Sequence, residues 1–210
     1  MKFHSYIFLS SEPLKLSLKE RKDFCRALAS KKIIVFSYAT LGLKVNTNIL
    51  LWLQSDSLED IQDLISNVLH TPLGRKLKIA HTLFGMSRPT QYSKKSDSQV
   101  ETGRKGGKYL VIYPFTKSTD WYKLSFEKRK SLMWGHIQIG KKHPETEQLL
   151  LYSFGVDDSE FIVSYETDEL LDFQTLVMEL RSDKVRAYTL RDTPIFTCIY
   201  KPLEKVLDYL

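Results

Sequence analysis

The chain has 210 residues, of which 42% are hydrophobic and 27% charged, an ordinary composition for a folded protein with a sizeable core. No run approaches the roughly 18–20 apolar residues of a membrane span, and the opening apolar stretch is too short for a signal peptide, so we expect a cytoplasmic protein. Cys25 and Cys198 lie far apart without metal-binding spacing, which predicts buried thiols in a reducing compartment. Much of the +6 formal charge falls on Lys94, Lys95 and residues 104–108 in a polar stretch, so no nucleic-acid partner is expected.

The first 90 residues alternate between strand-like and helix-like patterns. Partial alternation and β-branched or aromatic runs indicate strands, whereas apolar residues at spacings of three and four indicate helices. The predicted order is strand 3–10, helix 18–30, hairpin strands 32–42 and 47–55, helix 57–74 and strand 80–89. Ser57 is placed to cap the second helix, which we expect to end at Gly74.

A polar segment separates this part of the chain from the rest. Residues 90–108 are almost free of apolar side chains and rich in Ser, Lys and Gly, a composition typical of an exposed linker or loop. We therefore predict an amino-terminal half at 1–90, a linker at 91–107 and a carboxy-terminal half at 108–210.

The carboxy-terminal half repeats the plan of the first. Its predicted elements are strand 108–117, helix 124–142, hairpin strands within 147–158 and 160–168, helix 169–181 and a closing strand within 187–200. The repeat aligns Gly42 with Gly155 and Asp56 with Asp168. The order β-α-β-β-α-β is that of a ferredoxin-like unit. The pattern therefore predicts an α+β fold of two ferredoxin-like halves that join their sheets or pack around a shared core, a dimeric α+β barrel.

Common catalytic motifs do not occur in the sequence. It contains no GxGxxG after a strand, no Walker loop, no GxSxG and no HExxH. Dinucleotide binding, P-loop phosphoryl transfer, serine hydrolysis and zincin chemistry therefore lose their usual support.

Two elements of the second half carry side chains that could serve a ligand. Tyr113, Phe115 and Lys117 are two residues apart on one strand and so share a face, where the phenol and the amine could hold an anion. His136 is turned inward with Met133 on the following helix. A single inward histidine is either a packed residue or the axial ligand of a haem, whose porphyrin supplies the other four ligands.

A resemblance to a known family rests on three stretches of the second half, YPFTKSTDWYKLSFEKRKSLMWGH (113–136), LLLYSFGVDDSEFIVSYETDELLDFQTLVMELR (149–181) and YTLRDTPIF (188–196). They resemble the chlorite dismutase-like haem proteins, particularly their coproheme decarboxylase branch. The stretch from SYATLG (37–42) through FGMSRP (84–89) is similar to the amino-terminal half of the same family. The resemblance implies two ferredoxin-like halves, assembly into a homopentamer and binding of haem or coproheme by the carboxy-terminal half.

The resemblance also implies roles for single residues. His136 occupies the place of the proximal histidine that ligates the iron, with His143 as a second candidate. Tyr113 matches the redox-active tyrosine beside a propionate, and Lys117 matches the lysine four residues later. Gln148 falls at the distal position, where true chlorite dismutases place an arginine.

Two further residues are candidates for the surroundings of the porphyrin. Arg191 could reach a propionate, although a surface ion pair would suit it equally. Asp183 is available as the acidic partner that orients the proximal histidine.

The resemblance implies peroxide-dependent decarboxylation of iron coproporphyrin III, in which two propionates become vinyl groups and haem b is formed. Coproheme would be both substrate and redox centre, and hydrogen peroxide the oxidant. The alternatives are a haem-binding or trafficking protein without turnover, a haem-free assembly module, and a weak peroxidase or chlorite-degrading enzyme.

Overall fold

The computed structural model of the chain describes residues 1–90, 92 and 104–210. The first half contains β1 (Phe3–Ser10), α1 (Leu18–Leu28), β2 (Ile34–Ala39), β3 (Ile49–Ser55), α2 (Leu58–His70), the 3-10 helix η1 (Gly74–Lys76) and β4 (Lys78–Met86). The second half contains β5 (Tyr109–Lys117), α3 (Thr119–Lys123), α4 (Phe126–Gly140), β6 (Glu147–Tyr152), β7 (Phe161–Thr167), α5 (Leu170–Arg181), η2 (Lys184–Tyr188), β8 (Thr189–Arg191) and β9 (Phe196–Tyr200). The chain then adds α6 (Leu203–Val206) and η3 (Leu207–Tyr209).

Serine side chains begin three of the longer helices. Ser17 accepts a hydrogen bond from the backbone N–H of Glu20, whose carboxylate accepts one from the Ser17 N–H in return. Ser57 and Ser125 each accept a hydrogen bond from the backbone N–H three residues later. Such caps satisfy N–H groups that have no partner within the helix, which explains why α1, α2 and α4 begin where they do.

The strands form one antiparallel sheet that closes on itself. Among the described residues its order is β7-β6-β4-β1-β3-β2-β9-β5-β8, and β7 also pairs with β5. Strands β4-β1-β3-β2 belong to the first half and β9-β5-β7-β6 to the second, so each half has the same strand order. The halves join where β2 pairs with β9 and where β4 pairs with β6. The predicted α+β fold of two ferredoxin-like halves is confirmed.

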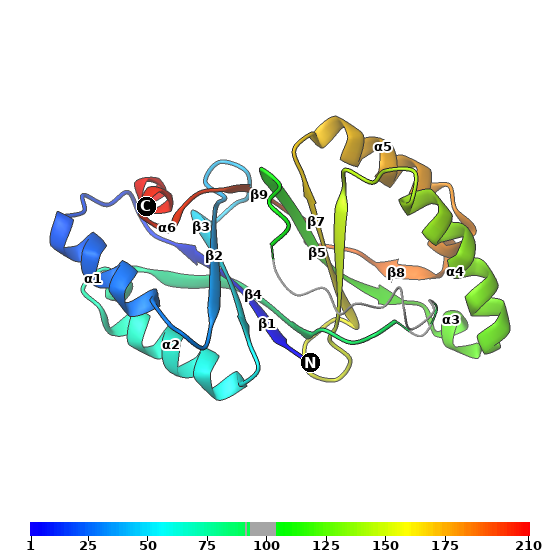
Figure 1. Cartoon of the computed structure of the whole chain (residues 1–210), viewed down its shortest axis with the longest axis horizontal. Helices are drawn as coiled ribbons and strands as arrows, with labels where there is room; N and C mark the ends of the chain where they lie inside the picture. Colours follow the sequence, from blue (N-terminus) through cyan, green and yellow to red (C-terminus); the bar gives the residue numbers. More distant parts are fainter. Residues whose placement is uncertain (91, 93–103) are drawn as a thin grey trace.

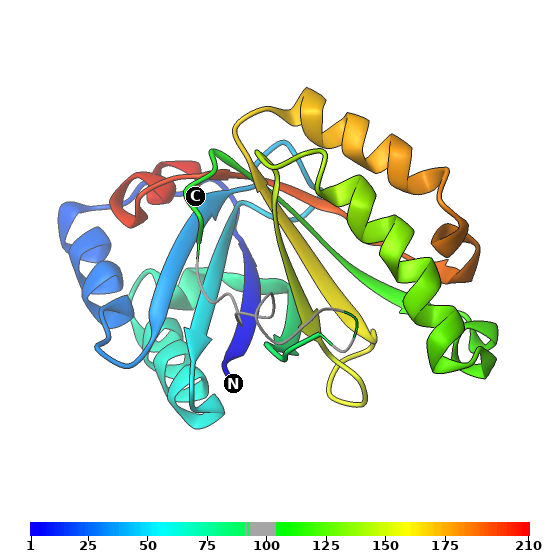
Figure 2. The same ribbon diagram turned by 45° about the vertical axis from the view of Figure 1, so that its right-hand side comes forward.

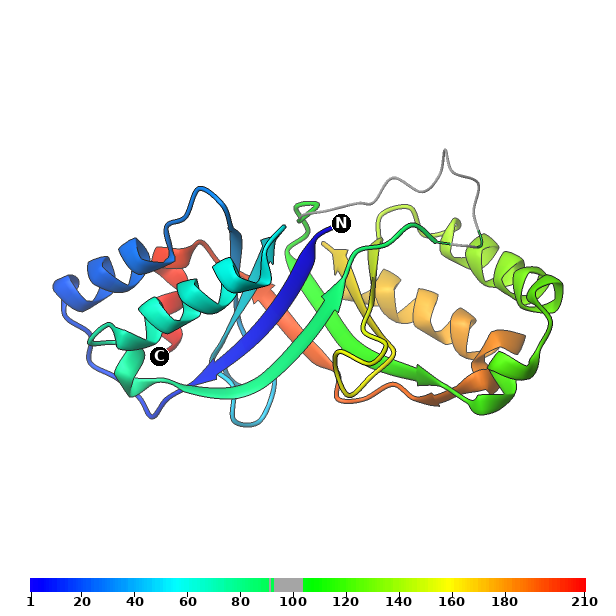
Figure 3. The same cartoon turned by 90° about the horizontal axis from the view of Figure 1, so that it is seen from below.

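The helices cover the outer faces of this sheet, and the inner faces meet between the halves (Figures 1 and 2). A central core of large aromatic and aliphatic side chains, among them Tyr6, Trp52, Leu110 and Phe196, lies between the two halves. The amino-terminal half has a second core under α1 and α2. Helix α6 and the last residues of the chain lie beside α1, so the carboxy terminus packs onto the amino-terminal half (Figure 3).

The structure differs from the sequence-based expectation in a few segments. The single strand predicted within 187–200 is instead the end of η2 followed by β8 and β9, and Pro194 lies in the break between them, where its missing N–H interrupts a ladder. Helices α3 and α6 are too short to show a helical period and were not expected. Most of the predicted linker at 91–107 lies outside the described residues, so its boundaries stay predictions. None of the helices in the described part is long and apolar enough to cross a membrane.

Candidate functional site

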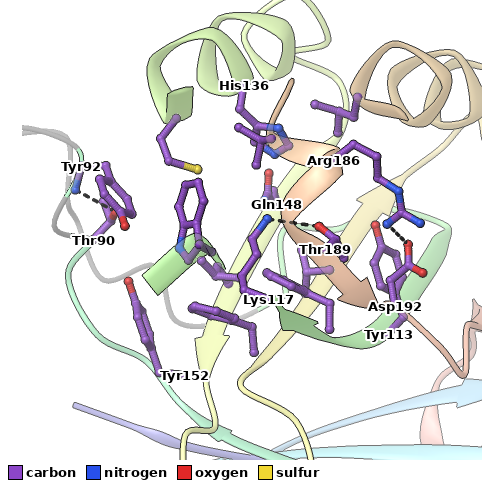
Figure 4. A pocket seen from close by; sticks show the side chains of 18 of the residues that line it. Thr90, Tyr92, Tyr113, Lys117, His136, Gln148, Tyr152, Arg186, Thr189 and Asp192 are labelled. Carbon is purple, nitrogen blue, oxygen red and sulfur yellow. Dashed lines mark hydrogen bonds and ion pairs between the residues drawn. The ribbon is translucent and has the colours of Figure 1, made fainter. Parts of the chain in front are cut away.

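A pocket of about 430 Å³ lies in the carboxy-terminal half, between α4 and α5 on one side and β5, β6 and β7 on the other (Figure 4). Met86 at the end of β4, and Arg88, Pro89, Thr90 and Tyr92 beyond it, also line the pocket. Aromatic and aliphatic side chains such as Phe115, Leu150, Phe161 and Val163 form most of its wall. The shape and lining suit a ligand that is largely apolar.

The pocket exists because α4 does not pack tightly on the sheet. None of the fifteen residues of α4, all of which the structure describes, is buried. In α2, by contrast, Ile61, Leu64 and Val68 are buried against the sheet below. The face of α4 that a core would normally cover therefore borders an open space.

His136 projects from α4 into this pocket and is held by a carboxylate. Its Nδ1 lies 3.2 Å from Oδ2 of Asp183, which immediately precedes η2. The two side chains are 28% and 12% exposed. Desolvation lowers the pKa of His136, against a smaller raising effect of Asp183, and nearby Lys117 lowers it further. The imidazole is therefore neutral near pH 7, with Nδ1 engaged and Nε2 available to a metal.

Tyr113 and Lys117 reach the same pocket from β5, as their shared strand face predicts. The Lys117 ammonium donates a hydrogen bond of 3.1 Å to the Thr189 hydroxyl. Burial lowers the pKa of Lys117 to about 8, and Arg186 contributes in the same direction. Burial also raises the pKa of the Tyr113 phenol, against the opposite influence of a hydrogen bond with Tyr165.

Four of the five predicted site residues meet in the pocket, and one does not. Gln148 on β6 lines it together with Tyr113, Lys117 and His136. Arg191 is exposed, lies outside the lining and reaches the Asp158 carbonyl oxygen at 3.5 Å. Its position outside the lining therefore gives no support to its predicted contact with a ligand in this pocket.

His143, the second candidate for the metal ligand, also lies outside the pocket lining. Its Nε2 is 3.6 Å from Glu179 and its Nδ1 3.9 Å from Glu145. The structure thus favours His136 over His143 as the histidine that can bind a pocket ligand.

The sequence did not reveal a cluster of charges at one end of the pocket. Asp192 Oδ2 lies 2.7 Å from Arg181 and 2.8 Å from Arg186, and all three line the pocket. These residues come from α5, η2 and the segment after β8, so their meeting depends on the tertiary fold. The only sequence signal for this cluster is the series of charged residues between 181 and 192, a pattern that is equally typical of an ordinary exposed loop.

A second cationic group lies toward the other end. Arg88, whose guanidinium is 5.6 Å from the centre of the Tyr152 ring, and Arg129 both line the pocket. The buried Nε of Arg129 has no hydrogen-bond partner among the described residues. Among the described residues, five cationic side chains thus border the pocket against one carboxylate, Asp192, which is already paired with two of them. The surplus of positive charge favours an anionic ligand.

These features fit an iron porphyrin with carboxylate side groups. No group of three or more His, Cys, Asp or Glu residues that could hold a metal occurs in the described part of the chain. A porphyrin brings its own four nitrogen ligands and requires one axial ligand from the protein. His136, whose Nδ1 contacts Asp183, can supply this ligand. Its apolar rings match the walls, and its carboxylates match the arginines.

The chain matches the family described as chlorite dismutase over residues 15–201. It belongs to the chlorite dismutase family. The prediction of this family from the sequence is confirmed, and its members include haem enzymes.

Two kinds of relative illustrate the range of this family. The chain is 26% identical over 182 residues to a coproheme decarboxylase of Mycolicibacterium smegmatis, a match that covers 86% of this chain and 79% of that protein. A crystal structure of a mutant chlorite dismutase from Candidatus Nitrospira defluvii superposes with a TM-score of 0.88 and 28% identity over 99% of this chain and 94% of that one. A chlorite dismutase of the same organism in complex with imidazole gives a TM-score of 0.82 and 25% identity, with coverages of 99% and 94%. The relatives are therefore named for different activities, and the solved chlorite dismutase structures share the fold of this chain.

Proposed function

We propose that this protein decarboxylates iron coproporphyrin III with hydrogen peroxide and forms haem b. The observation that carries the proposal is the position of Tyr113, whose phenol shares one pocket with His136 and adjoins the Arg181–Asp192–Arg186 cluster. A haem carrier needs an axial ligand but no oxidisable phenol next to a carboxylate-binding group. The phenol is thus the feature that separates decarboxylation from mere binding.

The proposed reaction balances with one peroxide for each propionate. A –CH₂CH₂COOH group and H₂O₂ give –CH=CH₂, CO₂ and two H₂O, so the propionate is oxidised by two electrons and the peroxide is reduced. The iron of the bound substrate supplies the peroxide chemistry. His136 holds the iron, Tyr113 passes the oxidising equivalent to the propionate beside it, and the arginines hold the propionates in place.

Lys117 has a second supporting role in this proposal. Its ammonium lies near the Arg186 and Asp183 side chains, and its lowered pKa makes it able to gain or lose a proton near neutral pH. It can pair with a propionate or transfer a proton during turnover.

Gln148 favours decarboxylation over chlorite decomposition. An amide at the distal position carries no charge, whereas chlorite is an anion whose reactive product an arginine would help to retain. The fold is shared with chlorite dismutases, whereas the family resemblance implies that they place an arginine at the position of Gln148. Chlorite degradation is therefore the less favoured reaction for this pocket.

The direct test is to bind ferric coproporphyrin III, titrate hydrogen peroxide and follow the mass of the porphyrin. We expect the loss of two carboxyl groups in the parent protein. Tyr113→Phe should bind coproheme with the same spectrum and lose conversion. Tyr152→Phe removes another phenol of the pocket wall and is the matched control, because its ring lies at the end lined by Arg88. Conversion that persists in Tyr113→Phe would contradict the proposed role.

Two histidine variants test the metal ligand separately. His136→Ala should abolish the axial-ligand spectrum of bound coproheme, whereas His143→Ala should keep it. Stoichiometric binding without any change of mass under peroxide would favour a carrier. Failure to bind any porphyrin would exclude both the enzyme and the carrier.

A further inference from the structure

The carboxylate of Glu160 joins the end of β5 to α3 at the edge of the pocket. Its Oε2 accepts a hydrogen bond of 2.7 Å from the backbone N–H of Lys117 and a second one from the phenolic O–H of Tyr122. Glu160 directly precedes β7 and is not among the described residues that line the pocket, whereas Lys117 and Tyr122 both are. One carboxylate oxygen outside the pocket therefore holds two parts of its wall.

The contact with Lys117 falls where β5 changes its partner strand. The ladder of β5 with β7 ends at the pair of Phe115 and Phe161. β5 then pairs with β8, and the register shifts between Thr116 and Lys117. Such an irregularity changes the direction of the side chains next to it, and an N–H that leaves a ladder needs a new acceptor. Glu160 supplies this acceptor through its side chain.

The amine of Lys117 has its own neighbours inside the pocket. Its Nζ donates a hydrogen bond of 3.1 Å to the Thr189 hydroxyl and lies 5.1 Å from the centre of the Trp121 ring (Figure 4). Trp121 belongs to α3, the helix whose Tyr122 is bound by Glu160. The backbone that carries the amine and the helix that carries the neighbouring ring therefore depend on the same carboxylate.

We propose that Glu160 is a positioning residue that fixes the backbone of Lys117 against α3 and so directs the Lys117 ammonium toward a carboxylate of the ligand. A hydrogen bond to an ionised acceptor is roughly twice as strong as a neutral one, which suits a contact that must hold a strand end in place. The inference rests on the proposed function for the identity of the ligand. The contact between Glu160 and Lys117 itself is a property of the protein without ligand.

The first test detects this contact in the ligand-free protein. In protein labelled with ¹⁵N-lysine, the Lys117 amide signal is identified by its loss in Lys117→Met, and a short hydrogen bond to a carboxylate shifts the proton of this signal downfield. Glu160→Ala should move the signal upfield, and Glu160→Gln, which keeps the shape and an acceptor oxygen, should move it part of the way. Asp158→Asn removes an exposed charge from the same loop and should leave it in place. An unchanged signal in both Glu160 variants would overturn the proposal.

The second test measures the affinity for ferric coproporphyrin III by spectroscopic titration. Glu160→Ala should weaken binding by roughly three- to tenfold, and by no more than Lys117→Met does, because Glu160 acts through the amine. Glu160→Gln should recover most of this loss, since both variants remove the charge and the amide oxygen can still accept the two hydrogen bonds. In the Lys117→Met background, Glu160→Ala should cause no further loss.

Two results of this titration would assign Glu160 to a purely structural role and overturn the inference. They are equal losses of affinity with and without the Lys117 amine, and equal affinities of Glu160→Gln and Glu160→Ala. A parent protein that binds no ferric coproporphyrin III would overturn the proposed function and, with it, the ligand assigned to Lys117. The shift of the Lys117 amide signal would in that case still support the contact with Glu160.

Discussion

The two halves of the molecule have the same strand order but differ in what lies between helix and sheet. In the amino-terminal half, Phe24 of α1 and Ile61 of α2 belong to one continuous buried core. In the carboxy-terminal half, a smaller core gathers under α5, and α4 stands over the pocket with no buried residue of its own. One repeat thus uses its helices for stability, and the other leaves space for a ligand.

The end of the chain increases this contrast. Val206, Leu207 and Leu210 follow the last strand of the carboxy-terminal half, yet they are buried in the core of the amino-terminal half. The core of the amino-terminal half therefore includes apolar side chains from the carboxy-terminal end of the sequence. A ligand-binding half with an incomplete core can remain folded because it shares a sheet with a well-packed neighbour.

The largest loss of stability should come from a cavity in the core of the amino-terminal half. Phe24 is fully buried, and Phe24→Ala should lower the free energy of unfolding by about 3–5 kcal/mol through lost burial and a new cavity. Met133→Ala on α4 removes a side chain that already borders open space and should cost less than about 1 kcal/mol without ligand. Urea unfolding of both variants measures the difference. Equal losses would show that the two halves are packed alike.

Ferric coproporphyrin III should fill the pocket of the carboxy-terminal half and so reduce the difference in packing between the two halves. At free ligand one hundred times Kd, linkage adds about 2.7 kcal/mol to the stability of the bound state. Hydrogen exchange should therefore slow most in α4 and η2, with smaller changes in α1 and α2. Protection spread evenly over all four helices would argue against a ligand confined to the carboxy-terminal pocket.

The fold was predictable because periodicity is a local signal that occurs twice in this sequence. The strands at 3–10 and 109–117 and the starts of the long helices appear where alternation and helical spacing place them, whereas α2 ends at His70 and not at the predicted Gly74. The packing of 203–210 on the distant amino-terminal half has no local signature, since it depends on where β9 leaves the sheet. The sequence therefore predicted the repeated plan but not which half its last residues complete.

The site was predictable where one element carries it and unpredictable where several meet. Tyr113 and Lys117 share a strand face, and His136 follows at helical spacing, so pattern and resemblance together placed them. The Arg181–Asp192 pair joins an α5 residue to one beyond β8, a contact that no spacing rule indicates. Arg191 is the converse case, because it was predicted to reach the ligand and lies outside the pocket lining although its neighbour Asp192 belongs to it.

Asp183→Asn tests whether ligand binding in the carboxy-terminal half depends on the contact between Asp183 and His136. The variant weakens the partner of His136 Nδ1 and should reduce coproheme affinity by roughly 10- to 100-fold. Glu179→Gln is the matched control, since Glu179 lies beside His143, outside the pocket. Spectroscopic titration should show a loss in the first variant alone. A similar loss in both would assign the effect to the helix pair rather than to the iron ligand.

Lys117 is expected to have the smallest effect on ligand binding and turnover, and this effect should depend on pH. Its pKa in the fold is about 8, against an ordinary value of 10.5, so its ammonium is charged below pH 8 and increasingly neutral above. In the window between those values the unfolded chain binds more protons, and the contribution of Lys117 to the free energy of unfolding rises with pH. Pairing with a substrate carboxylate requires the charged form and should weaken over the same window.

The affinity of the protein for ferric coproporphyrin III should therefore fall above pH 8. The titration of Lys117 should not lower the free energy of unfolding of the ligand-free protein over the same range. A bound carboxylate raises the pKa of Lys117, so kcat/KM should fall near pH 8 and kcat at higher pH, by at most tenfold per pH unit. Lys117→Arg keeps its charge at every pH used and should remove this decline, whereas Lys117→Met should bind weakly throughout. A decline that persists unchanged in Lys117→Arg would locate the titrating group elsewhere in the pocket, since the arginine has no proton to lose in this range.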